Sequence, residues 1–584
     1  MKKLLFLLLL SPSVFSQIAY QNNEATLIEG NPVYGVVTSN GLGSGISFFD
    51  YDNDGWDDIT LPASANNDFQ FYRNIGGTFE LQNLSIHSEG IQSRQAIWVD
   101  HDNDGDNDFF ATSDTGRCWF YRNDGENVFT DITMASGLPL EEVQFWGASW
   151  GDYNNDGFLD VFLSVRDNAQ IERNELYRNN GDGTFTNRTV AAGLHQSGFI
   201  SFCAAFFDYD NDGDQDIYMA NDKCVTSNIL YRNNGDETFT DVSEEAGVNL
   251  FMSAMSTTID DYNNDGWLDI YVTNFYPPFE EDVTTGNAFL RNNGDGTFSN
   301  IALENGTRFD SIGWGGVFLD ADNDTDIDLY VSGSIQADDP DGRLPSAFYE
   351  QTANEEYSLV SNTGFQNDTR ISFSNAIGDI QNDGLADIVV LNTNNEPIFL
   401  WENQTQNNNN WIKIALEGTA SNRMGIGSRI KVLVEDQIYY GYTLCGEGYI
   451  AQNSNREFFG LGDATNIDAI EVHWLSGQID RIENLDVNQT LTIVEGENPL
   501  STEDFGRDTI RSYPNPVSQE LHIDSLVEFI EGTLTIYSIQ GKQILSETVK
   551  SSSYSLNVAS LPSGFYILKI QKDDQTYISK FLKR

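Results

Sequence analysis

Seven acidic nine-residue segments recur along the chain and constrain its fold more than any other feature. They begin at Asp50, Asp100, Asp152, Asp208, Asp261, Asp320 and Asp379, with spacings of 50 to 59 residues. The first reads DYDNDGWDD and the last DIQNDGLAD, so that carboxylate or amide oxygens fall at positions 1, 3, 5 and 9. Repeats that keep one phase over this length indicate an architecture in which each copy is one structural unit.

Alternate oxygen atoms on a tightly turning backbone can converge on a small, hard cation. Position 6 is Gly in six of the seven segments, and Gly permits the sharp turn that such a loop needs. The side chains at positions 1, 3, 5 and 9, with a carbonyl at position 7, would supply the roughly six to eight oxygen ligands that calcium prefers. Up to seven calcium ions are therefore predicted, although Thr325 at position 6 of the sixth loop and Gln381 at position 3 of the seventh weaken the prediction for those two sites.

The predicted metal ligands are Asp50, Asp52, Asp54 and Asp58; Asp100, Asp102, Asp104 and Asp108; Asp152, Asn154, Asp156 and Asp160; Asp208, Asp210, Asp212 and Asp216; Asp261, Asn263, Asp265 and Asp269; Asp320, Asp322, Asp324 and Asp328; and Asp379, Asp383 and Asp387.

The residues around each acidic segment indicate strands and not helices. An EF-hand needs a bidentate Glu at position 12, where these segments hold Leu, Ala, Met or Val, so an EF-hand is excluded. The residues that follow each segment, such as Ile59 to Leu61, are β-favouring and apolar, which is typical of a buried strand. A second signature, Phe71-Tyr-Arg-Asn74 in the first repeat, precedes a Gly-containing turn and predicts a hairpin.

Each repeat therefore predicts four strands, A to D, with the acidic loop between A and B. Four strands in roughly 40 to 50 residues form one propeller blade, so the fold class is all-β, with a seven-bladed β-propeller and calcium-binding A–B loops over residues 17–405. The last repeat lacks a strand D, and the segment Gln17–Ile28 is expected to supply it and close the ring. In such blades the A–B loops and C–D turns share one face, and the D–A and B–C connections share the other.

Several side chains could contact a ligand of the propeller. The long B–C connections Thr273–Asn287 and Ser332–Ala347 are predicted to form a partner or glycan site, because recognition often uses long loops on a rigid scaffold. His195 could face a ligand or simply solvent. Four tryptophans beside the acidic loops could stack on sugars near the axis or pack between blades; they are Trp98, Trp146, Trp150 and Trp314.

Two parts of the chain before residue 497 resemble known families. The D-x-[DN]-x-D-G-x-x-D blades resemble FG-GAP/VCBS repeats, which implies calcium binding as in integrin α-subunit propellers. Residues 410–496, with Asn422-Arg-Met-Gly-Ile-Gly-Ser-Arg-Ile430 and Val472-His-Trp-Leu-Ser-Gly477, are similar to the ASPIC/UnbV domain, and their strand and Gly-turn pattern predicts a small β domain packed after the propeller. The pairing resembles bacterial proteins of the cartilage acidic protein type and implies no reaction.

The two ends of the chain indicate export. Residues 1–16, with Lys2, Lys3 and the apolar run Leu4–Leu10, are predicted to be a secretory signal peptide. After a linker at 497–510, residues 511–584 resemble the type A C-terminal sorting domain of type IX secretion, a β-sandwich. This resemblance implies contact with the type IX machinery and passage across both membranes of a Gram-negative bacterium, to the cell surface or outside.

Net charge, apolar runs and cysteines limit the partners, membrane segments and disulfides that the chain can have. The net charge of −58 disfavours binding to nucleic acid and anionic lipid. No stretch after the signal peptide approaches the roughly 20 apolar residues of a transmembrane helix. Export permits disulfides, so Cys203 and Cys224 could form a bridge or remain free thiols.

Two functions follow as hypotheses. The first is a non-catalytic adhesion or binding module for a glycan or protein partner, because seven phased acidic copies suit a scaffold better than a catalytic carboxylate pair, which occurs once per site. The alternative is a polysaccharide-active enzyme of lyase or dehydratase type. A lyase needs basic residues and a Tyr, His or Lys base near the axis. The only candidate cations on the predicted D–A connections are Arg94 and Arg370. Both are expected to pair with local acids.

Overall fold

The computed structural model describes residues 18–584 apart from 31, 35–41, 65–66, 114–116, 140–142, 276–282, 336–338, 353–354, 369, 501–509, 514–516, 526–531, 539–541, 550–552, 563 and 573–574. The predicted signal peptide, residues 1–16, lies outside this described part. The chain forms two compact units, Met1–Pro499 and Leu500–Arg584.

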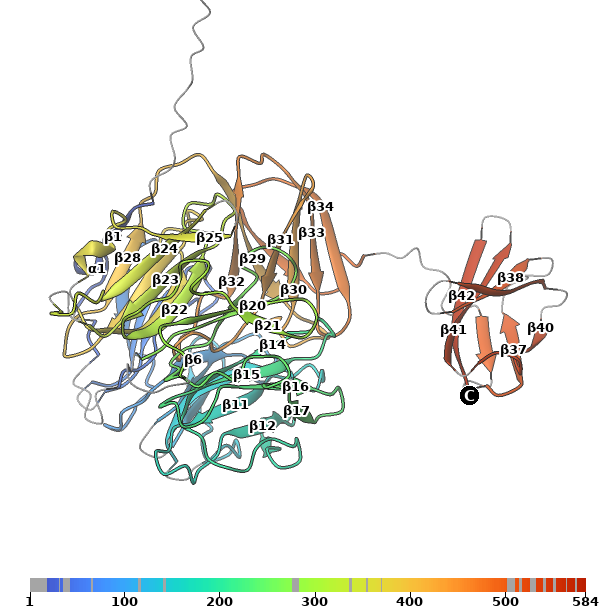
Figure 1. The fold of residues 1–584 in the computed structure, drawn as a ribbon, viewed down its shortest axis with the longest axis horizontal. Helices are drawn as coiled ribbons and strands as arrows, with labels where there is room; N and C mark the ends of the chain where they lie inside the picture. Colours follow the sequence, from blue (N-terminus) through green and yellow to red (C-terminus); the bar gives the residue numbers. More distant parts are fainter. Residues whose placement is uncertain are drawn as a thin grey trace, which may run out of the picture. The chain divides into compact units, whose positions relative to one another are not determined.

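In the described part of the first unit, the segment up to Asn403 forms seven four-stranded antiparallel sheets, each joined in up-and-down order (Figure 1). They are β2 to β5 (Ser47–Phe49, Asp58–Leu61, Gln70–Asn74, Phe79–Gln82); β6 to β9 (Ala96–Val99, Asp108–Ala111, Trp119–Asn123, Phe129–Asp131); β10 to β13 (Phe145–Gly151, Asp160–Val165, Glu175–Asn179, Phe185–Asn187); β14 to β17 (Ser201–Phe207, Asp216–Asn221, Ile229–Asn233, Phe239–Asp241); β18 to β21 (Thr258–Asp260, Asp269–Val272, Ala288–Asn292, Phe298–Asn300); β22 to β25 (Gly313–Leu319, Asp328–Gly333, Ser346–Thr352, Glu356–Leu359); and β26 to β28 (Ser372–Gly378, Asp387–Asn392, Phe399–Asn403) with β1 (Tyr20–Asn22). The predicted all-β fold of four-stranded blades is confirmed.

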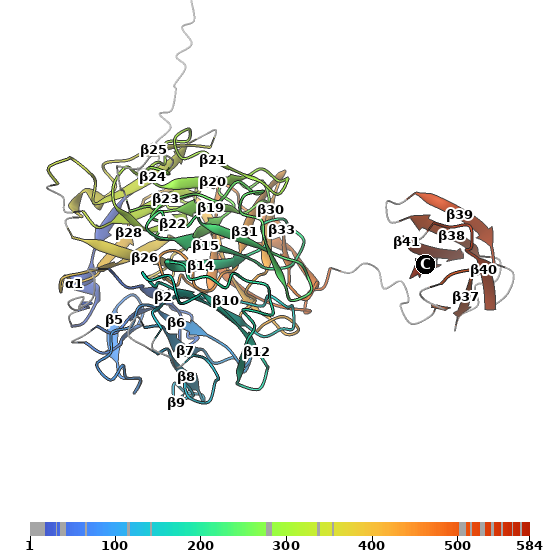
Figure 2. The ribbon, with the colours of Figure 1, turned by 60° about the horizontal axis from the view of Figure 1, so that its bottom comes forward.

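The sheets form a closed ring with strand A of each blade at the centre. The innermost strands β2, β6, β10, β14, β22 and β26 gather around one point in Figure 2. The ring closes where β1 pairs with β28, Tyr20 opposite Asn403 and Asn22 opposite Trp401, followed by the short helix α1 (Glu24–Leu27). The N-terminal segment thus supplies the missing strand D of the last blade, as predicted.

Packing between blades explains why strands A and B are apolar on both faces. All four residues of β3 and all six of β11 are buried, because each blade lies between two neighbours. The tryptophans considered as sugar platforms belong to this packing: Trp98, Trp146, Trp150 and Trp314 are at most 1% exposed. Of the two roles open to them, core packing is the one that the structure shows.

Residues 410–494 add a small β domain within the same compact unit. A three-stranded sheet of β29 (Asn410–Glu417), β32 (Arg456–Gly462) and β35 (Gln489–Val494) packs against a four-stranded sheet of β30 (Arg429–Val434), β31 (Gln437–Tyr442), β33 (Ile467–His473) and β34 (Ile479–Leu485). Ile412, Val432 and Ile470 belong to the apolar core of this domain. We refer to it below as the small β domain.

The second unit consists of two sheets with an apolar core between them, as expected for a β-sandwich. One sheet contains β36 (Ile510–Tyr513), β37 (Glu520–Ser525) and β40 (Ser553–Asn557); the other contains β38 (Thr533–Ser538), β39 (Gln543–Thr548), β41 (Gly564–Lys572) and β42 (Gln575–Lys583). Leu521, Ile536 and Leu568 are fully buried in this core.

Two further observations concern the described residues. None of the helices there has the length and apolar character needed to cross a membrane. Cys203 and Cys224 are not joined in a disulfide, and the Cys203 thiol donates to the Met255 carbonyl oxygen at 3.1 Å. Of the two alternatives for these cysteines, the structure shows the one without a bridge.

Candidate metal centres

The first Asp of every acidic loop organises the turn through main-chain hydrogen bonds. In loop one, Asp50 accepts from the N–H groups of Asp54 at 3.0 Å and Gly55 at 2.9 Å. The same pair of bonds, from positions 5 and 6 to position 1, occurs in all seven loops. Position 5 in turn accepts from the N–H of position 7 in every loop.

Two left-handed residues give each loop its shape. Position 6 has positive φ in every loop, including Thr325 at φ 86°, so the predicted weakness of loop six at this position does not change its turn. Position 4 also has positive φ, and it is Asn in all seven loops. Asn tolerates this region better than most residues because its side chain can hydrogen-bond locally.

The position 4 side chains also join neighbouring loops. Asn53 Nδ2 donates to the carbonyl oxygen of Gly105 at 2.9 Å, and Asn382 Nδ2 donates to that of Gly55 at 2.9 Å, across the ring closure. Equivalent bonds start from Asn103, Asn211 and Asn323. These bonds link the acidic loops of neighbouring blades. We call the face of the propeller that carries these loops the acidic face.

The last Asp of each loop connects strand B to strand C. Asp58 Oδ1 accepts from the N–H of Asn74 at 2.7 Å, and position 9 receives the equivalent bond in every other blade. The Asn74 side chain reaches the carbonyl oxygen of Ile380 in loop seven at 3.0 Å. The Tyr-Arg-Asn signature thus serves both the hairpin and the contact with the preceding blade.

Buried carboxylates stand close together in these loops. The Asp residues at positions 1 and 9 are buried in all seven loops, whereas position 5 is exposed. Burial is the largest cause that raises the pKa of Asp100 and Asp152 to about 7, of Asp261 to about 8 and of Asp58 to about 10. The charges of neighbouring Asp residues raise these pKa values further, and main-chain hydrogen bonds lower them in part. Such crowding of carboxylates without a matching cation is unfavourable, because desolvation and like charges both oppose ionisation.

Several buried oxygen atoms in the loops have no hydrogen-bond partner among the described residues. At position 3 these are Oδ1 of Asp52, Asp102, Asn154, Asp210 and Asn263, and at position 9 they are Oδ2 of Asp160 and Asp269. In loops one, two, four and six, three carboxylate oxygens also lie within 4.8 Å of one another. Buried polar atoms are nearly always satisfied in native proteins, so loops one to six fit a hard divalent cation by their donor chemistry.

Metal-free protein is expected to melt at a higher temperature at pH 5 than at pH 8. A carboxyl with a raised pKa binds its proton more tightly in the folded state, so its contribution is complete below the ordinary Asp pKa and is lost as pH rises through the folded values. Those values are about 6 for Asp208 and about 8 for Asp261. Thermal scans of chelated and desalted protein at pH 5, 6.5 and 8 test this order, and the reverse order would contradict the assignment of these carboxyls.

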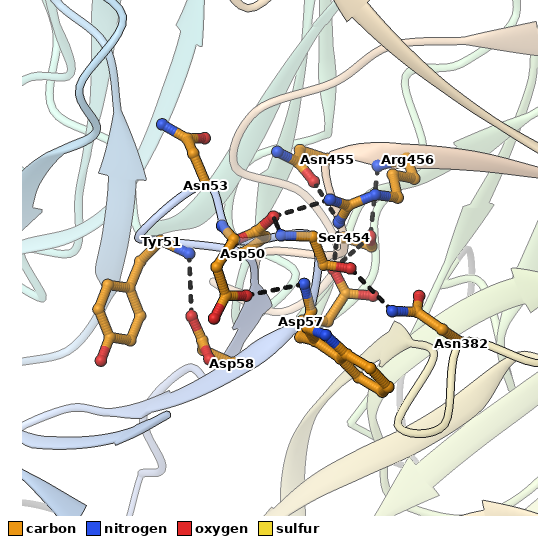
Figure 3. Close-up of polar contacts among 12 residues, drawn as sticks. Asp50, Tyr51, Asn53, Asp57, Asp58, Asn382, Ser454, Asn455 and Arg456 are labelled. Carbon is orange, nitrogen blue, oxygen red and sulfur yellow. Dashed lines mark hydrogen bonds and ion pairs between the residues drawn. The ribbon is translucent and has the colours of Figure 1, made fainter. Parts of the chain in front are cut away.

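The small β domain covers the face that carries the acidic loops. Arg456 Nη2 lies 2.7 Å from Asp50 Oδ2, and Arg456 Nη1 lies 3.1 Å from Asp57 Oδ1, with Ser454 also donating to Asp57 (Figure 3). The domain also contacts position 4 of other loops: Asn103 Oδ1 accepts from the Arg423 N–H at 2.8 Å. Equivalent contacts reach Asn211 from Arg429 and Asn264 from the Tyr440 N–H.

One connection of this domain fills the centre of the ring. Residues 443–455, between β31 and β32 and called the axial segment here, bond to the innermost strands: Gln452 Nε2 donates to the Trp98 carbonyl oxygen at 2.7 Å, and the Cys445 carbonyl oxygen accepts from the Trp150 N–H at 2.8 Å. The Tyr449 ring lies edge-on to Trp314, with 4.9 Å between centroids. Contacts to Phe48, Phe202, Thr257 and Ile377 bring the axial segment against all seven blades.

Other residues predicted to meet a ligand have structural partners or lie partly outside the described chain. His195 Nε2 is 2.8 Å from Asp241 Oδ2 on an exposed surface. Arg370 pairs with Glu24 at 3.0 Å as expected, whereas Arg94 donates to the main-chain oxygens of Leu42 and Gly43. Of the long B–C connections, 276–282 and 336–338 lie outside the described residues, so the predicted partner site stays a prediction.

Three features of the acidic face were not predicted from sequence. The position 4 Asn is present in all seven segments, so its invariance along the chain was an available signal for the bonds between loops. Arg456 and the axial segment carried no such signal, because their partners are hundreds of residues away. Nothing in the spacing of Tyr449 or Gln452 indicates that they enter a ring formed by other residues.

Comparisons with protein families confirm the three resemblances. Residues 100–163, 152–219 and 208–272 match the FG-GAP-like repeat. Residues 418–500 match the family described as ASPIC and UnbV, and residues 511–584 match the secretion system C-terminal sorting domain. The chain therefore contains FG-GAP-like repeats, an ASPIC/UnbV domain, which is the small β domain above, and a type IX sorting tail that marks it as a cell-surface or extracellular protein.

The individual proteins that this chain matches share little sequence identity with it. Cartilage acidic protein 1 of Xenopus tropicalis is 22% identical over 473 residues, which cover 75% of this chain and 71% of that protein. Among solved structures, PorZ, a surface component of the type IX secretion system of Porphyromonas gingivalis, has a TM-score of 0.20 at 9% identity, covering 93% of this chain and 81% of its own. The BP39L lectin of Burkholderia pseudomallei has a TM-score of 0.40 at 9% identity, covering 62% and 97%. Both TM-scores are too low to carry a conclusion about this chain.

Proposed function

We propose that this exported FG-GAP-like repeat protein holds calcium ions in its acidic loops and acts as a non-catalytic adhesion or binding module for a glycan or protein partner. It would act at the cell surface or outside the cell, after its sorting tail has engaged the type IX secretion machinery. The calcium ions serve structure in this proposal, because they bind loops that are hydrogen-bonded to the acidic loops of neighbouring blades.

The observation that carries the calcium proposal is the set of partnerless buried oxygens at position 3 of loops one to five. Each lies beside buried Asp residues at positions 1 and 9. Hydrogen-bond donors from the protein already satisfy the position 1 oxygens in every loop, for example the N–H groups of Asp104 and Gly105 on Asp100. Oxygen ligands of this kind suit calcium, which accepts carboxylate, amide and main-chain oxygens in flexible geometry.

The covered acidic face directs the search for a partner to the other face. The ASPIC/UnbV domain and its axial segment occupy the acidic face and the ring centre, as the contacts of Arg456 and Gln452 show. The D–A and B–C connections lie on the opposite face, where Phe251 and Phe275 are 44% and 38% exposed. Exposed aromatic side chains on a rigid ring are suited to bind a glycan or protein.

A polysaccharide lyase or dehydratase is supported less well. The groups near the axis that come nearest to the base and the cations of a lyase are Tyr449, Arg94 and Arg166. Both arginine side chains lie over the Trp146 ring. All three are buried, with exposures of 0%, 0% and 3%, and Arg166 is neutralised by Asp222 at 2.7 Å. A polymer chain cannot reach groups that are packed in this way, so the binding-module proposal is preferred.

Replacing two connections tests the partner site. Residues 276–282 and 336–338 would be exchanged for Gly-Ser segments of equal length, which keeps the buried Asn274 and Asn287 and the ion pair between Asp339 and Arg343. The calcium-loaded full chain is expected to bind a member of an array of neutral and acidic glycans or an outer-surface protein, and the variant is expected to lose this binding. A matched exchange at 140–142, in the D–A connection between β9 and β10, should retain it. Binding that survives the double exchange would contradict the predicted site.

A further inference from the structure

Loop seven differs from the other acidic loops in its ligands. Position 3 is Gln381, so Asp379, Asp383 and Asp387 are its three carboxylates at ligand positions. Loops three and five also have three carboxylates, but each keeps a partnerless buried Oδ1 of Asn at position 3. In loop seven, no such buried oxygen occurs among the described residues. The feature that points to a bound cation in loops one to five is therefore missing from loop seven.

A lysine from the ASPIC/UnbV domain lies on this loop. Lys413, on β29, places Nζ 2.7 Å from Asp379 Oδ2 and 2.7 Å from Asn382 Oδ1. Both members of this ion pair are buried, with side-chain exposures of 1% for Lys413 and 0% for Asp379. An isolated charge at such a position is costly, so each group requires the other.

The rest of β29 shapes the site around this lysine. The indole ring of Trp411 packs on Gly384, the position 6 residue, so closely that a Cβ there would lie 2.0 Å from the ring. Lys413 Nζ is 5.7 Å from the centre of the same ring and 5.8 Å from that of Phe458. Loop one offers the contrast: Arg456 contacts Asp50, but Asp50, Asp52 and Asp58 still cluster within 4.8 Å.

We propose that Lys413 of the ASPIC/UnbV domain replaces a metal ion as the counter-charge of loop seven, which therefore holds no calcium. This inference rests on the proposed function, in that the other loops are taken to hold calcium. It gives the domain a defined role at the ring closure: Lys413 binds blade seven and Arg456 binds blade one, on either side of the junction that Asn382 and Gly55 bridge.

Counting bound ions in matched variants tests the proposal. Native mass spectrometry of the calcium-loaded full chain would be compared for wild type, Asp212→Asn in loop four and Asp383→Asn in loop seven. Both substitutions remove the exposed position 5 carboxylate of one loop and keep its size. We expect Asp212→Asn to lose one calcium ion and Asp383→Asn to lose none. Loss of one ion from Asp383→Asn would overturn the proposal.

Thermal melts in saturating calcium test the counter-charge independently. Lys413→Met should lower the melting temperature, because Asp379 is left buried without its cation, and adding Asp379→Asn should restore at least half of the loss. Lys431→Met is the control, because Lys431 belongs to the same domain, is only half-buried and lies over the Tyr440 ring; this substitution should not change the melting temperature. A double variant that melts below Lys413→Met would overturn the role of Lys413. If wild type carried no calcium, the proposed function would fail while these melts still decided the role of Lys413.

Discussion

Removing calcium is expected to lower the melting temperature of the first unit by more than about 10 °C. Each ion bound at about 100 times its Kd adds about 2.7 kcal/mol, so ions in loops one to five would add about 13 kcal/mol. About 1 kcal/mol shifts the melting temperature of a unit of this size by about 1 °C. The physical reason is the burial of Asp at positions 1 and 9 of every loop. Without cations these carboxylates repel one another and position 3 oxygens remain unsatisfied.

Differential scanning calorimetry with calcium and with a chelator measures this effect. The second unit, residues 500–584, contains none of the acidic loops and serves as an internal control whose transition should not move. Adding calcium back should restore the first transition, and magnesium should restore it less, because magnesium demands stricter octahedral geometry. Coincident scans with and without chelator would contradict the proposed structural role of the loops.

Arg456→Met is expected to destabilise the first unit by about 3 to 5 kcal/mol, the usual cost of removing one partner from a buried ion pair. Arg456 contacts both Asp50 and Asp57, and the exposed fractions of the Arg456 and Asp50 side chains are 8% and 1%. Its loss leaves the carboxylate of Asp57, which is not a predicted calcium ligand, buried without the arginine, and removes the same cation from Asp50. Asp57 also accepts from the Asp379 N–H at 3.0 Å, so the damage should reach the ring closure.

Chemical denaturation of the first unit in saturating calcium measures this loss. Arg423→Met is the matched control, because Arg423 belongs to the same domain and pairs with Glu417 at 2.7 Å on the surface. Exposed ion pairs contribute about 0 to 1 kcal/mol, so the control should differ little from wild type. Equal stability of the Arg456 and Arg423 variants would show that the ASPIC/UnbV domain does not hold the acidic face through charge.

The local parts of this architecture were predictable from sequence, and the long-range parts were not. The acidic segments, the Tyr-Arg-Asn signature and the apolar strand B are short patterns, so each repeat could be assigned four strands. Ring closure by the N-terminal segment followed from a missing strand D. In contrast, Arg456 and Asp50 are 406 residues apart, and no pattern in either segment records their contact.

The same distinction applies to the candidate metal centres. The oxygen-bearing positions were evident from spacing, and the structure places positions 1 and 9 in the interior and position 5 at the surface. The turn of loop six shows why single substitutions can mislead: Thr325 adopts the left-handed conformation that Gly has in the other loops. For loop seven, the Gln at position 381 was visible in the sequence, but the ion pair between Lys413 and Asp379 was not.

The account depends most on whether oxygen atoms in the acidic loops hold calcium. Elemental analysis of purified full-length protein, dialysed against micromolar calcium, measures this directly as the molar ratio of calcium to protein. The account predicts several calcium ions per chain, with loops one to five occupied and loop seven empty. A chain that contains no bound divalent metal, and whose unfolding is unchanged by a chelator, would contradict it.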